Sequence, residues 1–142
     1  MKTDAPPVRA SRRGVTAANA TMRAWFADRG WKPLPFQREV WRRYLAGESG
    51  LLHTPTGSGK TLAAIGGPLI EALAAPGKPG VTRVLWVTPL RALANDTARS
   101  LQAPIDGLGL GWRVGLRTGD ASARDKRLAR AGKLDVLVIT PE

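Results

Sequence analysis

The residues best suited to chemistry lie between Thr54 and Thr61, where the chain reads TPTGSGKT. Gly57 and Gly59 can adopt backbone angles closed to other residues, so several N–H groups can converge on one polyphosphate. Lys60 adds a positive charge for the β- and γ-phosphates, and the Thr61 hydroxyl is placed to bind Mg²⁺. The pattern predicts a phosphate-binding loop in which Lys60 and Thr61 serve catalysis. The residues predicted to bind the nucleotide are Thr54, Pro55, Thr56, Gly57, Ser58, Gly59, Lys60 and Thr61.

The flanking residues predict the elements that position this loop. The short apolar run from Gly50 to His53 predicts a buried strand before it, and apolar residues at helical spacing predict a helix from Lys60 to about Ala74. The positive end of that helix dipole would face the phosphates. Thr54 stands where the general motif has its first glycine. The alternative, a glycine-rich turn that binds nothing, is disfavoured by this strand and helix context.

Composition limits the class of protein. The 142 residues suffice for one domain with its own core, and the 43% of hydrophobic residues indicates a globular chain. The chain has no cysteine, which excludes disulfides and thiolate metal sites. Its net charge of +11 favours a polyanionic partner such as nucleic acid. No stretch has the length and apolarity of a membrane span or a signal peptide, so we expect a cytoplasmic protein without membrane contact.

The rest of the chain predicts an α/β fold. Residues 1–15 contain four basic residues and no apolar periodicity, which predicts a disordered basic tail. Strands that alternate with helices predict a parallel sheet with helices on both faces. The predicted helices are Thr16–Arg29, one that starts at Pro35 and stops at Gly47, Lys60–Ala74, Arg91–Gln102 and the very basic Ala123–Ala131. The predicted strands after the loop are Val81–Val87, Trp112–Leu116 and Asp135–Ile139.

Polar signatures follow these three strands. They read TPLRAL from Thr88, RTGD from Arg117 and TPE from Thr140. Ligands of open parallel sheets bind beyond the carboxyl ends of the strands. We therefore expect these signatures to line one edge of the sheet, together with the phosphate-binding loop.

The order of the motifs resembles a known family. The segments PLPFQ (Pro33 to Gln37), TPTGSGKT, TPLRAL and ITPE resemble the first motor domain of superfamily 2 DNA and RNA helicases. FQREVW and GLRTGD resemble the large helicase-related family, most closely its bacterial ligase-associated DEXH-box branch. The resemblance implies that residues 16–142 form the amino-terminal part of a RecA-like ATP-binding domain. The implied protein is an ATP-dependent DNA helicase of DNA repair, with ATP and Mg²⁺ as cofactors.

The resemblance also implies residue roles. Gln37 matches the glutamine that recognises adenine, and Trp31 or Phe36 would pack near the base. The residues that match the family's motifs for binding the sugar-phosphate backbone of the tracking strand are Thr88, Arg91, Thr118 and Thr140, with Asp120 as a further candidate. The implied partner is single-stranded or partly duplex DNA. RNA is an alternative track, and DNA-repair ligases or nucleases are candidate partners.

Two parts of a superfamily 2 motor have no match in this sequence. The family uses an acidic Asp-Glu motif on a later strand and arginine fingers from a second domain, and no Asp-Glu pair occurs here. Because phosphoryl transfer depends on positioning and charge neutralisation, the resemblance predicts a domain truncated before this motif, with almost no hydrolysis by this chain alone. Two alternatives stay open: another P-loop enzyme such as a nucleotide kinase, and a non-catalytic nucleic-acid-binding protein.

Overall fold

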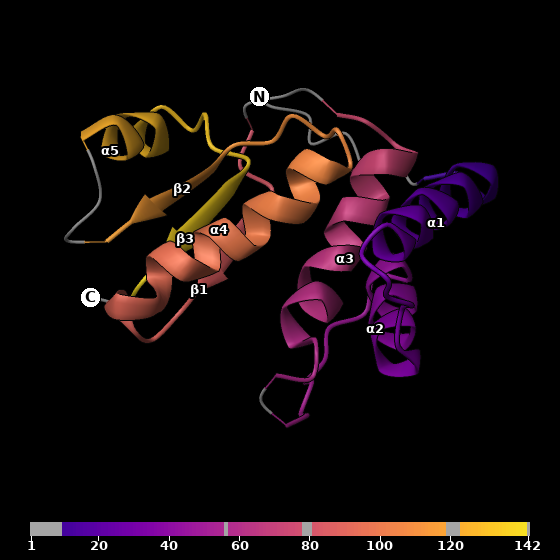
Figure 1. Cartoon of the computed structure of the whole chain (residues 1–142). Helices are drawn as coiled ribbons and strands as arrows, with labels where there is room; N and C mark the ends of the chain where they lie inside the picture. The colour runs from indigo at the N-terminus through magenta and orange to yellow at the C-terminus, as the bar shows by residue number, and fades with distance from the viewer. Residues whose placement is uncertain (1–9, 56, 78–80, 119–122, 142) are drawn as a thin grey trace.

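Three helices form one side of the molecule in the computed structural model, which describes residues 10–55, 57–77, 81–118 and 123–141. They are α1 (Arg12–Ala27), α2 (Pro35–Leu45) and α3 (Lys60–Ala74). Both α1 and α2 pack against α3, on the right of Figure 1. None of the described helices is long and apolar enough to cross a membrane.

The other side of the molecule is a parallel sheet of three strands, β1 (Val84–Val87), β2 (Val114–Arg117) and β3 (Val136–Ile139). The strand order is β1-β3-β2, so β3 is central. Helix α4 (Arg91–Gly107) connects β1 to β2, and α5 (Ala123–Arg130) connects β2 to β3. The predicted α/β architecture with a parallel sheet is confirmed, and each of these strands overlaps a predicted one.

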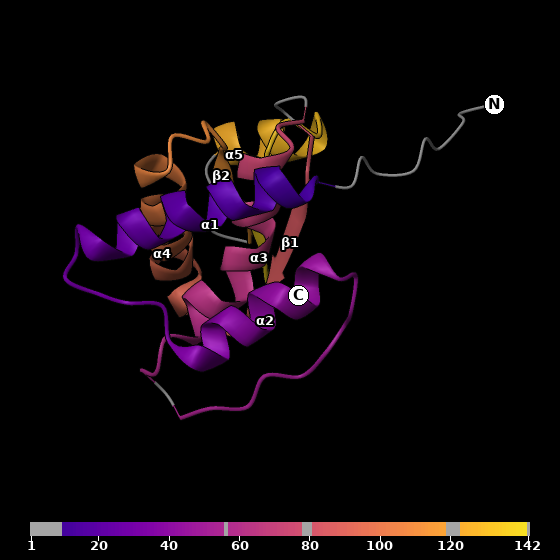
Figure 2. The same cartoon turned by 90° about the vertical axis from the view of Figure 1, so that its right-hand side faces the viewer.

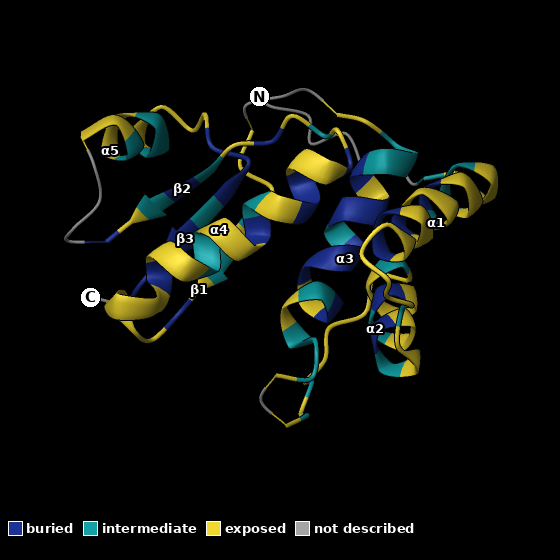
Figure 3. Cartoon of the chain, viewed as in Figure 1, coloured by how far each residue is buried: buried dark blue, intermediate teal, exposed yellow. Residues whose placement is uncertain are grey.

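One hydrophobic core joins the two sides. Val136 and Val138 of β3, Leu101 and Ile105 of α4 and Leu69 of α3 are all fully buried within it. Trp41 and Trp112 are buried too, and Trp86 is half-buried and packs against this core. Figure 3 shows the buried residues concentrated where α3 and α4 face each other and the sheet.

The second face of the sheet is covered less completely. Side chains alternate between faces along a strand, so Leu85 and Val87 point away from the face that carries Val84 and Trp86. Their side chains belong to residues that are 60% and 54% exposed, respectively. The helical cover expected on both faces is therefore incomplete over the described residues.

Close contact between α2 and α3 fixes the relative position of these two helices. The indole Nε1 of Trp41 donates a hydrogen bond of 3.0 Å to the carbonyl oxygen of Leu62. A Cβ atom at Gly66 would lie 2.1 Å from that Nε1, so only glycine allows this approach. The next residue, Gly67, gives the same room to the ring of Tyr44. This contact holds the start of α2, with Gln37, beside the start of α3.

The strand predicted before the phosphate-binding loop is absent. Residues 48–55 contain no strand, and Leu51 is 94% exposed. A strand forms its hydrogen bonds with neighbouring strands, and the three strands of the described sheet pair only with one another. The apolar run from Gly50 to His53 thus has the composition of a strand without a pairing partner.

Two helices extend beyond their predicted ends. Helix α1 starts at Arg12 rather than Thr16, because Ser11 Oγ accepts a 3.0 Å hydrogen bond from Gly14 N and caps it. Part of the predicted tail is therefore helical, and residues 1–9 lie outside the described residues. Helix α4 continues past Gln102 and through Pro104 to Gly107, because Ile105 belongs in the core.

Candidate nucleotide and nucleic-acid sites

The loop between Thr54 and Lys60 has the backbone geometry that its glycines predict. Gly57 and Gly59 have φ angles of 78° and 93°, in the left-handed region. The hydroxyls of Thr54 and Ser58 lie 2.6 Å apart and hydrogen-bond across the loop. Helix α3 begins at Lys60, directly after Gly59. Thr56, also predicted to contact the nucleotide, lies outside the described residues.

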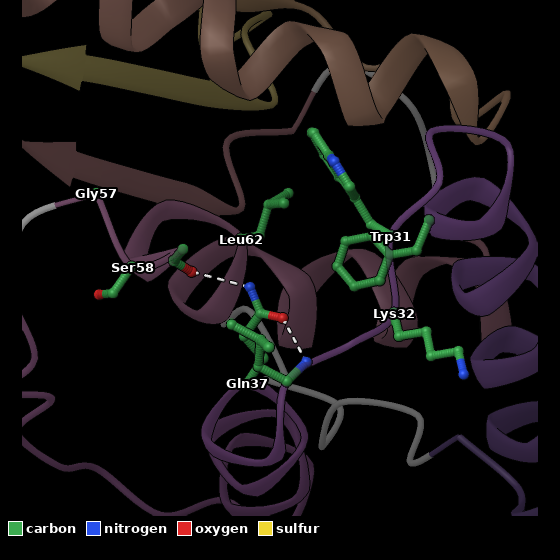
Figure 4. Close-up of a pocket in the computed structure, with 9 residues that line it drawn as sticks. Trp31, Lys32, Gln37, Gly57, Ser58 and Leu62 are labelled. Carbon is green, nitrogen blue, oxygen red and sulfur yellow. Dashed lines mark hydrogen bonds between the residues drawn. The ribbon is translucent and has the colours of Figure 1, made fainter.

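Gln37 connects the start of α2 to this loop. It is 3% exposed, and its Oε1 accepts a 2.8 Å hydrogen bond from Leu34 N. Its Nε2 donates a 3.1 Å hydrogen bond to Gly59 O (Figure 4). Because an amide side chain has two donor hydrogens and an oxygen with two lone pairs, one of each remains for a ligand. The sequence predicted a base contact for Gln37 and missed its contact with the loop.

A cavity of about 490 Å³ lies beside Gln37, within the range typical of small-molecule sites. Trp31, which is 52% exposed, forms part of its wall, as Figure 4 shows. The second aromatic residue of the wall is Phe26 rather than Phe36, with its ring centroid 6.3 Å from that of Trp31. The complete lining is Phe26, Trp31, Lys32, Leu34, Gln37, Gly57, Ser58, Gly59 and Leu62.

Lys60 and Thr61 form the first turn of α3. Lys60 is half-buried, Thr61 is exposed, and neither forms an ion pair with another described residue. The described residues also contain no cluster of three acidic, histidine or cysteine side chains that could hold a metal ion. Since Mg²⁺ usually keeps several waters and binds through substrate phosphates and few protein groups, the single hydroxyl of Thr61 fits a metal ion that arrives with the nucleotide.

The predicted residues at the carboxyl ends of the strands lie together. Thr88, Thr140 and Thr118 directly follow the paired ends of β1, β3 and β2, and Thr88 N donates a 2.9 Å hydrogen bond to Ile139 O. We call this row of three threonines the threonine row. Its members are only 5–8% exposed. This burial was not expected, because the predicted contact with the DNA backbone requires accessible groups. Their strand positions place them on the face of Val138, which is covered by helices.

Two further features belong to this edge. Thr140 Oγ1 is buried without a hydrogen-bond partner among the described residues. Arg91 is the first residue of α4 and is exposed, so it extends from the same edge. Asp120 and Glu142 lie outside the described residues. The structure therefore groups Thr88, Thr118, Thr140 and Arg91 around one edge, with a buried row and one exposed cation.

Comparison with known proteins places this chain in a family. The model of the family described as "DEAD/DEAH box helicase" matches residues 34–142, which include the loop and the sheet edge. The chain belongs to the DEAD/DEAH box helicases. The superfamily predicted from the order of the motifs is thus confirmed, together with the partial RecA-like fold.

Its relatives include Lhr helicases. The chain is 39% identical to the Lhr helicase of Mycolicibacterium smegmatis over 87% of its own length, and 33% identical to the Lhr helicase/uracil glycosylase of Escherichia coli over 84%. It spans 9% of the length of each. A structure of Mycobacterium smegmatis Lhr bound to ssDNA and AMP-PNP matches with a TM-score of 0.70 and 38% identity, over 86% of this chain and 17% of that one. The ligase-associated branch stays a prediction.

Proposed function

We propose that this chain is the nucleotide-binding part of an ATP-dependent DNA helicase that acts in DNA repair. The observation that carries the proposal is the bridge by Gln37 between Leu34 N and Gly59 O, beside a cavity that both glycines of the loop and Trp31 line. One side chain thereby touches the base side and the phosphate side of a single site. That arrangement suits a purine nucleotide whose phosphates extend toward α3.

ATP is the nucleotide that the proposal assigns to this site. The free donor and acceptor capacity of Gln37 matches the donor and acceptor pair on the adenine edge. Trp31 offers a flat apolar surface for the base, and the positive end of α3 with Lys60 offers charge for the phosphates. The Mycobacterium smegmatis Lhr structure contains AMP-PNP, which supports the choice of ATP. Mg²⁺ would accompany the phosphates and bind Thr61.

Single-stranded DNA is the track that the proposal assigns to the edge of the sheet. Arg91 would contact a backbone phosphate, and the threonine row would provide the unpaired hydroxyl of Thr140. The ssDNA in the Mycobacterium smegmatis Lhr structure and the net charge of +11 support a nucleic-acid partner. RNA as a second track, a cytoplasmic location and DNA-repair ligases or nucleases as partners belong to the same proposal.

Titration of Lys60→Ala with ATP tests the nucleotide site. Lys60 is half-buried and carries charge rather than packing, so we expect ATP affinity to fall at least about tenfold, roughly 1.4 kcal/mol, with an unchanged melting temperature. Lys133→Ala is the matched control, because it removes an exposed lysine that lines no part of the cavity. Equal ATP affinity for Lys60→Ala and the unmodified chain would contradict the nucleotide site.

A further inference from the structure

The outer surface of α5 is strongly basic and belongs to neither of the sites above. Its four cations are Arg124, Lys126, Arg127 and Arg130, which we call the basic face of α5. We propose that the basic face of α5 binds the phosphate backbone of duplex DNA. The inference rests on the proposed DNA function and adds to it a second contact, on a different element and for a different form of DNA.

The helical positions of the four cations place them on one side of α5. At 100° per residue they cover an arc of about 160°, and all four are exposed. The opposite side carries Asp125, Leu128 and Ala129, which are half-buried. Asp125 Oδ2 accepts a 3.3 Å hydrogen bond from Leu116 N, so the acidic side chain of this helix is turned toward β2. Apart from Ala123, the outward arc therefore contains only cations.

The charge of this face is not neutralised within the described parts of the chain. No ion pair involves any of the four cations. Helix α2 is different, because Glu39 lies 2.8 Å from Arg42 and 2.7 Å from Arg43. Like charges three or four residues apart destabilise a helix. A purely structural role does not explain the basic face of α5, whereas a polyanionic partner does.

The surface beside α5 is also hollowed. A cavity of about 220 Å³ lies between α5 and the start of β2, and Arg113 and Arg124 both border it. Asp125 borders it too, with its carboxylate engaged by Leu116 N. Each arginine can donate two parallel hydrogen bonds to a phosphate, and two arginines from different elements can approach one phosphate group from two directions.

Duplex DNA fits this surface better than a single strand. Proteins that hold single strands use exposed aromatic rings on which bases stack, and the basic face of α5 has none. A duplex offers its phosphates without exposing base faces, at one negative charge per roughly 1.7 Å of axis. Helix α5, about 12 Å long at 1.5 Å per residue, spans several of these charges. Figures 1 and 2 both show α5 well away from the phosphate-binding loop, so the two sites do not overlap.

The test compares two variants of the whole chain that lose the same charge. Arg124→Gln/Arg127→Gln/Arg130→Gln removes three cations from α5, and Arg12→Gln/Arg13→Gln/Arg23→Gln removes three exposed arginines from α1. Binding to a blunt duplex and to single-stranded DNA is measured by fluorescence anisotropy over a range of salt concentrations. Circular dichroism and melting temperature show that each variant is folded.

We expect the α5 variant to lower duplex affinity at least tenfold at low salt and to reduce the logarithmic salt slope by up to about 2.7, roughly 0.9 for each lost phosphate contact. The α1 variant should have a much smaller effect, and the α5 variant should bind single strands nearly as well as the unmodified chain. Equal duplex affinities for the two variants would overturn the inference while single-strand binding still supports the proposed function. If the unmodified chain binds neither duplex nor single-stranded DNA, both the inference about α5 and the proposed DNA function are overturned.

Discussion

The helical region (α1, α2 and α3) and the sheet region (β1 to β3, α4 and α5) differ in how completely their apolar side chains are packed. In the helical region, α2 lies so close to α3 that Gly66 and Gly67 are needed for Trp41 and Tyr44 to fit. In the sheet region, Leu85 and Val87 remain more than half exposed. A helix forms its backbone hydrogen bonds within itself, whereas a strand depends on its neighbours. The helical region is therefore defined by its own sequence to a greater extent than the sheet region.

The nucleotide site lies where this difference has the largest consequence. The residues after the loop belong to α3, whose backbone hydrogen bonds start with Ala63 N to Gly59 O, but residues 48–55 before the loop form no strand. The side of the site formed by Gln37, Trp31 and α3 is held by helix packing. The segment from Gly50 to His53, which leads into the loop, forms no hydrogen bonds with the described sheet.

Truncation of one leucine in each region should show the difference directly. Leu69 of α3 is fully buried, so Leu69→Ala should lower the free energy of unfolding by about 2–5 kcal/mol through lost burial and a cavity. Leu85 of β1 is 60% exposed, so Leu85→Ala should change it by no more than about 0.5 kcal/mol. Urea denaturation measures both. A loss for Leu85→Ala as large as that for Leu69→Ala would mean that the open face of the sheet is covered.

The glycine contact between α2 and α3 is the next largest test. In Gly66→Ala the new Cβ meets Trp41 Nε1, and such overpacking costs about 1–3 kcal/mol. The higher helix propensity of alanine stabilises the helix by no more than about 1 kcal/mol, so we expect a net destabilisation. Gly50→Ala is the control, because a Cβ there meets nothing within 4 Å and its φ angle suits any residue. Thermal unfolding should show a lower melting temperature for Gly66→Ala alone. Identical melting temperatures would contradict the close approach of the helices.

Local patterns predicted much of this fold because local interactions determine those parts. The start of α3 at Lys60 and its end at Ala74 agree with the prediction, since glycine before the helix and apolar spacing within it are visible in sequence. The three strands overlap their predictions because short runs of branched apolar residues favour buried strands. The cap by Ser11 was missed although serine before a helix is a recognised signal.

Pairing and burial were the parts that local patterns predicted poorly. The run from Gly50 to His53 has strand composition, but composition does not supply a pairing partner. The threonine row was predicted to gather at one edge, and it does, yet its burial depends on tertiary packing, which local patterns do not contain. The bridge from Gln37 to Gly59 joins residues 22 positions apart in sequence. Its one local signal is a glutamine at the third position of a helix, which often binds the backbone N–H at the start of that helix.

Arg91 provides a smaller test, at the edge of the sheet. Arg91→Ala should weaken binding of single-stranded DNA of any sequence by one phosphate contact and lower the logarithmic salt slope by about 0.7, with ATP affinity unchanged. Arg99→Ala, on the same helix and 80% exposed at its side chain, is the control. Fluorescence anisotropy with two unrelated oligonucleotides measures the effect. If the two variants bind alike, the track does not pass over the start of α4.

The smallest expected effect concerns Tyr44, which reports the α2 to α3 contact. Partial burial, followed by the nearby Glu71 carboxylate, which accepts a 3.3 Å hydrogen bond from the phenol, raises the pKa of Tyr44 to about 12. A raised pKa in the folded state means that the unfolded chain loses this proton first, at about pH 10. The contribution of Tyr44 to stability is therefore complete below pH 10 and is lost as the pH rises toward 12.

The phenolate absorbance measures this pKa directly, because Tyr44 is the chain's single tyrosine. In the folded chain the absorbance should rise near pH 12, and in urea near pH 10. Tyr44→Phe should remove this part of the alkaline loss of stability and leave the lysine contribution in place. A folded-state transition near pH 10 would show that the phenol is solvated and that α2 does not hold it against α3. The helical region would then be no better defined than the sheet region at this position.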